Sequence, residues 1–214
     1  MLVACWSVKG GSGTTVVAAA LGMMLASAGP RGATLVDLGG DLPAALGVPE
    51  PEGPGVAQWL DAGAGVAADA LRRLETEVGG GLALVARGGG PMPDAGGERL
   101  AAALAGDRHA VVDCGPPGLA PGVAVAAAAG LSLLVLRPCY LALRRALAAP
   151  LRPSGVVLVT ERERSLGRRD VEDVLGVPVR AEVAWDPVVA RRVDAGLLAG
   201  NLPRTLERAL RRAA

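Results

Sequence analysis

Short runs of valine, leucine and alanine recur along the chain, separated by longer stretches rich in alanine, leucine and arginine. Continuous apolar runs of this length are typical of strands that are buried on both faces of a sheet. The runs predict strands at residues 2–6, 33–36, 82–85, 110–112, 131–136, 156–159 and 177–183. Because stretches of helical length separate them, we expect an α/β fold with a mostly parallel β-sheet and helices on both faces. The pattern leaves the order of the strands open.

The longest apolar stretch, residues 119–136, would be flagged as a membrane span by hydropathy alone. It contains Pro121, Gly122 and Gly130, and an alanine-rich half meets a leucine- and valine-rich half at Gly130. We therefore interpret it as a buried helix followed by a buried strand. The apolar run at the N-terminus is too short for an export signal and lacks a basic segment before it, which favours a cytoplasmic protein.

Composition fits one α/β domain over residues 1–214, since the chain is 51% hydrophobic and carries a net charge of +1. Its aromatic residues are Trp6, Trp59, Tyr140 and Trp185, and phenylalanine is absent. Modules that stack nucleic-acid bases need more aromatic platforms, and the dispersed arginines form no concentrated basic tract. Nonspecific DNA binding is therefore not expected, although weak contact stays open.

Three cysteines, Cys5, Cys114 and Cys139, lie in apolar runs and lack the C-x-x-C spacing of metal and redox sites. We interpret them as buried, reduced thiols of a cytoplasmic protein.

The segment with the clearest chemistry follows the first predicted strand and opens an alanine-rich stretch. Its sequence is Lys9-Gly10-Gly11-Ser12-Gly13-Thr14-Thr15. Glycines let successive backbone N–H groups face one centre, and a helix N-terminus adds a partial positive charge, so this turn is suited to hold a polyphosphate. The Thr15 hydroxyl is placed to ligate Mg²⁺.

Lys9 is the only lysine in the chain, and the other strongly basic side chains are all arginine. This bias indicates that lysine has been replaced by arginine wherever the two are interchangeable. A lysine kept in the glycine loop therefore suggests a position that needs a compact point charge. A lysine left by chance is the alternative.

The glycine loop resembles the deviant Walker A motif, K-G-G-x-G-K-S/T, of the MinD/ParA family of P-loop ATPases. The resemblance implies that ATP or ADP is bound with Mg²⁺, and that Lys9 acts catalytically by reaching the ATP of the partner in a homodimer. It places the nucleotide against Lys9, Gly10, Gly11, Ser12, Gly13, Thr14 and Thr15. Thr14 stands where the family has a second lysine. Without that charge-assisted contact, worth about 1.5 to 3 kcal/mol, we expect weaker or slower use of ATP.

Two later segments resemble the family's switch regions. The second predicted strand ends at Asp37, and Gly39 stands where the family has the carboxylate that orients water, with Asp41 as the nearest substitute. The run from residue 109 to 118, with Asp113 at the strand end, resembles the Walker B strand and its D-x-P-P-G switch. The resemblance implies that Asp37 and Asp113 contact the nucleotide and, with Thr15, bind the metal. The structural alternative for Asp113 is a buried strand-end carboxylate that caps the next turn.

Several features resemble the TadZ and CpaE branch of the family, which serves Flp/Tad pilus assembly. Thr14 and the G-D-L-x-x-x-L-G segment at residues 40–47 are typical of that branch. Thr160 stands where the family often has an adenine-binding asparagine. The resemblance implies a homodimeric localisation factor with weak or absent ATP hydrolysis. Its partners would be pilus or cell-pole machinery, and its place cytoplasmic, polar or near a membrane.

Three other functions stay open. The first is a fully active ParA or MinD ATPase in chromosome partition or septum-site placement. The second is an NAD-dependent Rossmann oxidoreductase, suggested by Gly11-x-Gly13 and Asp37, although Val16 stands at the third glycine position. The third is a scaffold that binds no nucleotide.

The C-terminal stretch, residues 201–214, predicts a basic amphipathic helix with leucines at 202, 206 and 210. Such a helix either packs on the sheet or binds a membrane surface. Because it lacks aromatic anchors, we expect packing.

Overall fold

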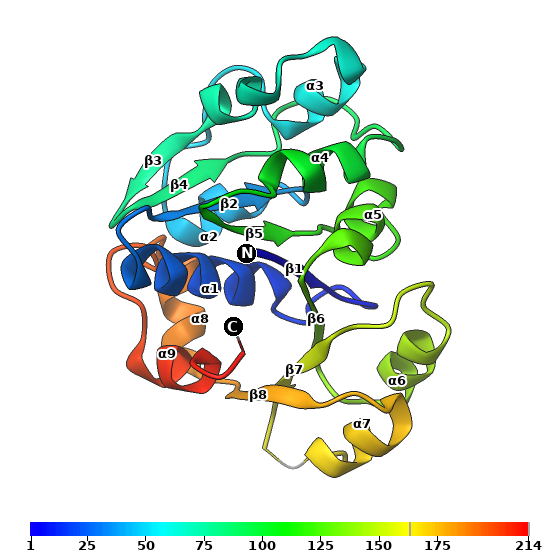
Figure 1. The fold of residues 1–214 in the computed structure, drawn as a ribbon. Helices are drawn as coiled ribbons and strands as arrows, with labels where there is room; N and C mark the ends of the chain where they lie inside the picture. Colours follow the sequence, from blue (N-terminus) through cyan, green and yellow to red (C-terminus); the bar gives the residue numbers. More distant parts are fainter. Residues whose placement is uncertain (163, 214) are drawn as a thin grey trace.

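An eight-stranded sheet runs through the molecule, and helices cover both of its faces (Figure 1). The computed structural model describes residues 1–162 and 164–213. The strands are β1 (Leu2–Trp6), β2 (Ala33–Asp37), β3 (Thr76–Gly79), β4 (Leu82–Val85), β5 (His109–Asp113), β6 (Leu131–Leu136), β7 (Gly155–Thr160) and β8 (Val179–Ala184). The α-helices are α1 (Thr14–Ala28), α2 (Leu42–Leu46), α3 (Val56–Asp61), α4 (Gly97–Leu104), α5 (Ala120–Ala128), α6 (Tyr140–Leu147), α7 (Arg168–Leu175), α8 (Pro187–Asp194) and α9 (Arg204–Leu210). Short 3-10 helices η1 (Gly63–Gly65), η2 (Ala68–Ala70) and η3 (Arg72–Leu74) connect α3 to β3.

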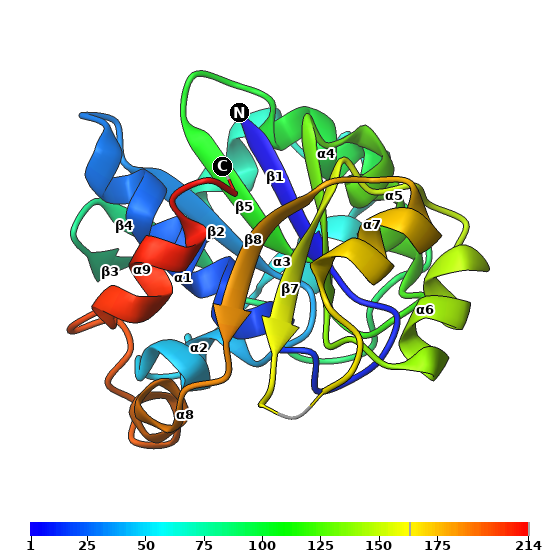
Figure 2. The same cartoon turned by 90° about the horizontal axis from the view of Figure 1, so that it is seen from below.

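The strand order is β3-β4-β2-β5-β1-β6-β7-β8. Every neighbouring pair is parallel except β3 and β4, which are antiparallel. The prediction of a mostly parallel α/β sheet is therefore confirmed. Figure 2 shows the arrowheads of β7 and β8 at the same edge of the sheet, near α8. At this edge the loops after β1, β2 and β5 are neighbours, because Asp113 lies in register with both Cys5 and Asp37.

Two apolar layers sandwich the sheet. One layer packs α1, α2, α8 and α9 against one face, and the other packs α3, α4, α5, α6 and α7 against the opposite face. In both layers, alanine, valine and leucine supply nearly all of the core. The α-helix and strand predicted on either side of Gly130 are α5 and β6, so that interpretation is confirmed. No helix within the ranges given above is long and apolar enough to cross a bilayer.

Strand β3 was not expected from the sequence. Its side chains are mostly exposed, so it shows no apolar run. It pairs with β4 through a turn in which Gly79, Gly80 and Gly81 all have positive φ. The sheet therefore ends in an antiparallel hairpin that hydrophobic patterning does not reveal.

The C-terminal helix packs on the body of the protein, as expected. Leu206 and Leu210 of α9 are buried against β8 and α1, while Leu202 is half-buried. Ala214, the last residue of the predicted amphipathic stretch, lies outside the described residues.

The three cysteines are free thiols. Cys5 and Cys114 are buried, and burial raises the pKa of both thiols. Cys139 is half-buried, and its Sγ caps the start of α6 by accepting a hydrogen bond from the Ala142 N–H at 3.4 Å. The prediction of buried thiols thus holds for two of the three.

Candidate functional site

The glycine loop joins the buried strand β1 to the N-terminus of α1, as the sequence predicts. Gly13, the residue before α1, has φ 88°, and Gly11 has φ 73°, conformations that other residues rarely adopt. The Ser12 hydroxyl donates a hydrogen bond of 2.8 Å to the Lys9 carbonyl, which holds the loop in a closed turn. Glycine is therefore required at positions 11 and 13 by the backbone itself.

The N-terminus of α1 lacks the usual partners for its first N–H groups. No side chain caps it, and its first turn contains no acidic residue. An α-helix leaves its first four N–H groups without partners inside the helix, and these groups attract anions. The loop and the helix end together form a cradle suited to an anion, which fits the predicted polyphosphate site.

The two loop positions at which the resemblance places lysines, residues 9 and 14, differ in residue type and environment. Lys9 is exposed, and none of the ion pairs between described residues involves it. Thr14, at the position where a lysine was expected by resemblance, is buried in the first turn of α1. The loop itself therefore carries one positive side chain, and that side chain is free to contact a second molecule.

Asp113 ends β5 beside the loop and is 1% exposed. Burial raises the pKa of its carboxyl, and the charge of Asp41 adds to this, while the neighbouring Thr15 hydroxyl and the Gly115 N–H oppose it. The Gly115 N–H donates to Asp113 Oδ1 at 3.2 Å. Asp113 thus caps the next turn, as the structural alternative predicts, and also lies next to Thr15, as a metal site requires.

Asp37 is fully buried at the end of β2, and the loop after it folds around its carboxylate. Its Oδ1 accepts hydrogen bonds from the N–H groups of Gly39 at 2.9 Å and Gly40 at 2.7 Å, and its Oδ2 accepts one from Leu42 at 2.8 Å. Burial raises the pKa of Asp37 to about 6, the charge of Asp113 adds to this, and the three N–H groups oppose it. Both oxygens are therefore engaged in shaping their own loop.

A magnesium ion fits this edge through water more readily than through direct carboxylate ligands. Among the described residues, no group of three or more His, Cys, Asp and Glu side chains is arranged to hold a metal. Mg²⁺ usually keeps several waters and takes one or two protein oxygens plus substrate phosphates. The Thr15 hydroxyl and the Asp113 carboxylate, next to the anion cradle, match that donor set.

The loops after β2 and β5 touch through two glycines. A Cβ atom added to Gly39 would lie 3.3 Å from the Gly115 Cα atom, and one added to Gly115 would lie 3.1 Å from the Gly39 nitrogen. The water-orienting carboxylate expected by resemblance at position 39 thus has little room. Asp41 is exposed at the start of α2, near enough for its charge to raise the pKa of Asp113.

A cavity of about 270 Å³ opens beside the glycine loop. Its walls are mostly apolar and come from the loop, α1, the ends of β7 and β8, and α8. They include Gly11, Ser12, Gly13, Val16, Val17, Arg137, Val159, Trp185, Asp186 and Val189. A mostly apolar cavity beside a cradle of backbone N–H groups suits a ligand that has both an apolar and an anionic part. Thr160, at the position where the family often has an adenine-binding asparagine, lines a different cavity. Its neighbour Val159 lines the cavity beside the glycine loop.

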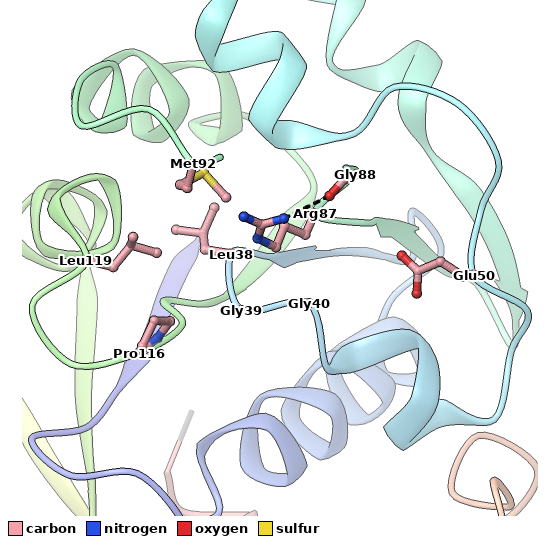
Figure 3. Close-up of a pocket in the computed structure, with 9 residues that line it drawn as sticks. All are labelled: Leu38, Gly39, Gly40, Glu50, Arg87, Gly88, Met92, Pro116 and Leu119. Atoms are coloured by element: carbon pink, nitrogen blue, oxygen red, sulfur yellow. Dashed lines mark hydrogen bonds between the residues drawn. The ribbon is translucent and has the colours of Figure 1, made fainter. Parts of the chain in front are cut away.

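A second cavity of about 440 Å³ lies over the loops after β2, β4 and β5. Figure 3 shows the Arg87 side chain beside Leu38 and Met92 and above Gly39 and Gly40. The Arg87 guanidinium donates to the carbonyls of Gly88 at 3.0 Å and Gly90 at 2.8 Å. Both acceptors belong to the loop after β4, so Arg87 fixes the shape of that loop, and its Cδ atom lies 3.2 Å from where a Cβ atom on Gly40 would be.

Sequence patterning missed Arg87, Arg137 and Glu161, which stand at this edge of the sheet. Arg137 follows β6 directly, Glu161 follows β7 directly, and Arg87 follows β4 after one residue. In parallel sheets the carboxyl ends of the strands carry the site. A charged residue just after each predicted strand was therefore a signal that could have found all three.

Solved structures with a similar fold are MinD and ParA ATPases. The septum site-determining protein MinD from Pyrococcus horikoshii OT3, complexed with Mg-ADP, has a TM-score of 0.77 and 19% identity, covering 97% of this chain and 91% of its own. Pyrococcus furiosus MinD has a TM-score of 0.76 and 19% identity, covering 100% and 99%. A ParA family ATPase from Chlorobium tepidum TLS has a TM-score of 0.74 and 19% identity, covering 98% and 96%. No protein-family model matches the sequence, and no curated protein matches it.

The fold is therefore the α/β fold of the MinD and ParA ATPases, and the predicted P-loop architecture is confirmed. The oxidoreductase alternative is not supported. A Rossmann sheet places its first two strands side by side, whereas here β5 lies between β1 and β2.

Proposed function

We propose that this protein is a nucleotide-responsive dimeric switch of the MinD/ParA type that binds ATP or ADP with Mg²⁺ and hydrolyses ATP weakly or not at all. The observation that carries the proposal is the uncapped N-terminus of α1, preceded by a loop whose glycines have positive φ. This cradle lies beside Thr15, Asp113 and an apolar cavity of about 270 Å³. The similar MinD of Pyrococcus horikoshii binds Mg-ADP, which supports the same ligand class for this chain.

Each loop residue has a role in this proposal. The N–H groups of residues 10–15 hold the phosphates, and Thr15 with water-linked Asp113 holds Mg²⁺. Asp37 shapes the loop that faces the metal through its three backbone contacts. The exposed Lys9 contacts the nucleotide of a second copy and so links ATP binding to dimer formation.

Weak hydrolysis follows from the side chains around the cradle. Thr14 removes a cation from the loop, and Gly39 offers no carboxylate to orient water. The charge of Asp41 raises the pKa of Asp113, so the two carboxyl groups are near each other. Asp41 is nevertheless exposed at the surface. We propose that the protein acts by changing its oligomeric state with the bound nucleotide, with turnover playing a minor part.

The cellular role we propose is that of a localisation factor for Flp/Tad pilus assembly, like TadZ and CpaE. Thr14 and the segment at residues 40–47 support it, because both match that branch. The structure gives the segment a packing role: a Cβ atom on Gly47 would lie 1.7 Å from the Gly196 carbonyl oxygen, so α2 and the end of α8 meet through two glycines. Partners would then be pilus or cell-pole proteins, at the pole or near the membrane.

Calorimetric titration of the purified protein with Mg-ATP and Mg-ADP, paired with a phosphate-release assay, tests the nucleotide part of the proposal. We expect measurable binding of at least one nucleotide and a release rate far below that of an active MinD or ParA ATPase run in parallel, with and without DNA or lipid. Binding accompanied by turnover at the rate of that reference would favour the active ATPase. Absence of any binding would favour the scaffold.

A further inference from the structure

An arginine outside the glycine loop makes direct contact with it. Arg137 follows β6, and its guanidinium donates a hydrogen bond of 3.1 Å to the Gly11 carbonyl. Within residues 1–162 and 164–213, no other arginine or lysine side chain hydrogen-bonds to residues 7–15. Arg137 also lines the same cavity of about 270 Å³ as Gly11, Ser12 and Gly13.

A carboxylate fixes Arg137 in this position. Glu161, at the end of β7, forms an ion pair with Arg137 through one oxygen. Its other oxygen forms an ion pair of 2.8 Å with Arg164. The three side chains carry a net charge of +1, so the group stays cationic although the carboxylate is shared.

The loop needs such a charge from elsewhere. A polyphosphate carries several negative charges, while the loop supplies one cation, Lys9, which is exposed. Thr14 offers a hydroxyl where a lysine would reach the phosphates. A guanidinium presents five N–H donors in a planar fork, so contacts to Gly11 and Glu161 leave donors for a third acceptor.

We propose that Arg137 is a phosphate-binding residue that supplies, from the end of β6, the positive charge that Thr14 does not supply from the loop. Glu161 is its positioning residue. The ligand class is a nucleoside polyphosphate, and the inference rests on the proposed nucleotide binding. Charge from a neighbouring strand would let the loop lose its lysine and still hold nucleotide.

The test is calorimetric titration of Mg-ATP and Mg-ADP into the wild type, Arg137→Ala, Arg137→Gln and Arg164→Ala. Arg164→Ala is the matched control, because it removes a cation from the same Glu161 network without touching the loop. We expect Arg137→Ala and Arg137→Gln to weaken the binding of both nucleotides by about 10-fold or more, since hydrogen bonds to charged groups are lost. Arg164→Ala should stay within about twofold of the wild type, as is usual for exposed ion pairs.

A rescue experiment separates charge replacement from loop support. If Arg137 stands in for the missing lysine, Thr14→Lys should restore the affinity lost in Arg137→Ala and should tighten binding by a larger factor there than in the wild type, so that the two changes are non-additive. Thermal melts of all variants check that they fold. If Arg137→Ala does not fold, Arg137→Gln replaces it, because the glutamine amide can still donate a hydrogen bond to the Gly11 carbonyl.

The outcomes distinguish the inference from the function on which it rests. If the wild type binds nucleotide and Arg137→Gln binds it equally tightly, the proposed role of Arg137 is overturned, while the proposed function stands. Equal losses in Arg137→Ala and Arg164→Ala also overturn it, because the network would then be merely structural. A wild type that binds neither nucleotide overturns the proposed function as well.

Discussion

The glycine loop after β1 and the loops after β2 and β5 lie at the same edge of the sheet, yet they differ in what they need from side chains. The glycine loop acts through backbone N–H groups, set by positive φ at Gly11 and Gly13. The other two loops surround the acidic residues Asp37 and Asp113 and meet through Gly39 and Gly115. A backbone cradle survives the replacement of side chains, whereas water activation requires a carboxylate at a defined place.

This contrast explains how binding and hydrolysis can separate in one site. Losing one lysine side chain weakens the binding of an anion but does not abolish it, because the backbone N–H groups and the helix end remain. Losing the carboxylate that orients water slows the hydrolytic step itself. The comparison predicts a protein that keeps nucleotide recognition and lacks efficient turnover.

The largest effect is expected from breaking the cradle. In Gly13→Val, a β-branched residue must take a φ of 88°, and its side chain would extend toward Val159, whose Cγ2 atom lies 3.9 Å from the added Cβ. We expect the affinity for Mg-ATP to fall by about 100-fold or more, from backbone strain and misdirected N–H groups. Gly10→Ala is the control, because position 10 has no positive φ and no atom near an added Cβ. Equal affinities for the two variants would contradict the cradle.

The next effect comes from restoring the missing cation. Thr14→Lys should tighten Mg-ATP binding by about 10- to 100-fold, the range expected for a charge-assisted hydrogen bond. Thr14→Met, which has similar length and no charge, should show no gain. Phosphate release should stay slow in Thr14→Lys, since Gly39 is unchanged. A fast release rate would show that one lysine is enough and would remove the distinction between the loops.

A pH dependence of stability should mark the acidic loops. The pKa of Asp37 is raised from 3.8 to about 6 in the folded protein, so the folded state binds this proton more tightly than the unfolded state. The resulting stability is present below pH 3.8 and is lost as the pH rises through about 6. We expect the difference in melting temperature between the wild type and Asp37→Asn to change by a few degrees, roughly, between pH 4 and pH 7.

This measurement uses differences between two proteins, because other carboxylates titrate in the same window. Melting curves of wild type and Asp37→Asn across pH 4 to 7, without nucleotide or metal, give the required comparison. Parallel curves would mean that Asp37 titrates normally and that burial at the end of β2 does not hold its proton.

The smallest effect is expected from returning a carboxylate to position 39. Gly39→Asp must displace the loops slightly, since the new Cβ lies 3.3 Å from Gly115, and it adds charge beside Asp37. We expect a loss of about 1 kcal/mol in the free energy of unfolding. Gly39→Asn has the same size without the charge, so Mg²⁺ should recover more stability for the aspartate variant. Identical responses of both variants to Mg²⁺ would place the metal away from this loop.

Much of the fold could be predicted from the sequence, because parallel strands buried on both faces appear as continuous apolar runs. Strands β1, β4 and β6 begin and end where the sequence predicts. Strand β3 was not predicted, because its side chains are mostly exposed and it therefore contains no apolar run. Strand order also could not be predicted, since it depends on which strands, far apart in the sequence, pair with one another.

The candidate site could be predicted in part. The glycine loop and Asp113 lie together because both follow neighbouring parallel strands. The three backbone contacts of Asp37 and the approach of Gly39 to Gly115 depend on loop conformation, which local patterns do not specify. Arg137 and Glu161 meet across the ends of β6 and β7, a contact that arises from the strand order.

The central claim, that nucleotide controls association of two copies, is tested most directly by the molar mass in solution. Light scattering after size exclusion should be run without nucleotide, with Mg-ADP and with Mg-ATP, for the wild type, Lys9→Ala and Lys9→Arg. We expect the mass of the wild type to double with Mg-ATP, and Lys9→Ala to remain a monomer at the same concentration, because in our proposal the exposed ammonium group contacts the nucleotide of the other copy. Lys9→Arg should dimerise poorly, since a planar fork replaces a point charge. A mass that is the same in all three conditions, or a Lys9→Ala protein that dimerises like the wild type, would contradict the account.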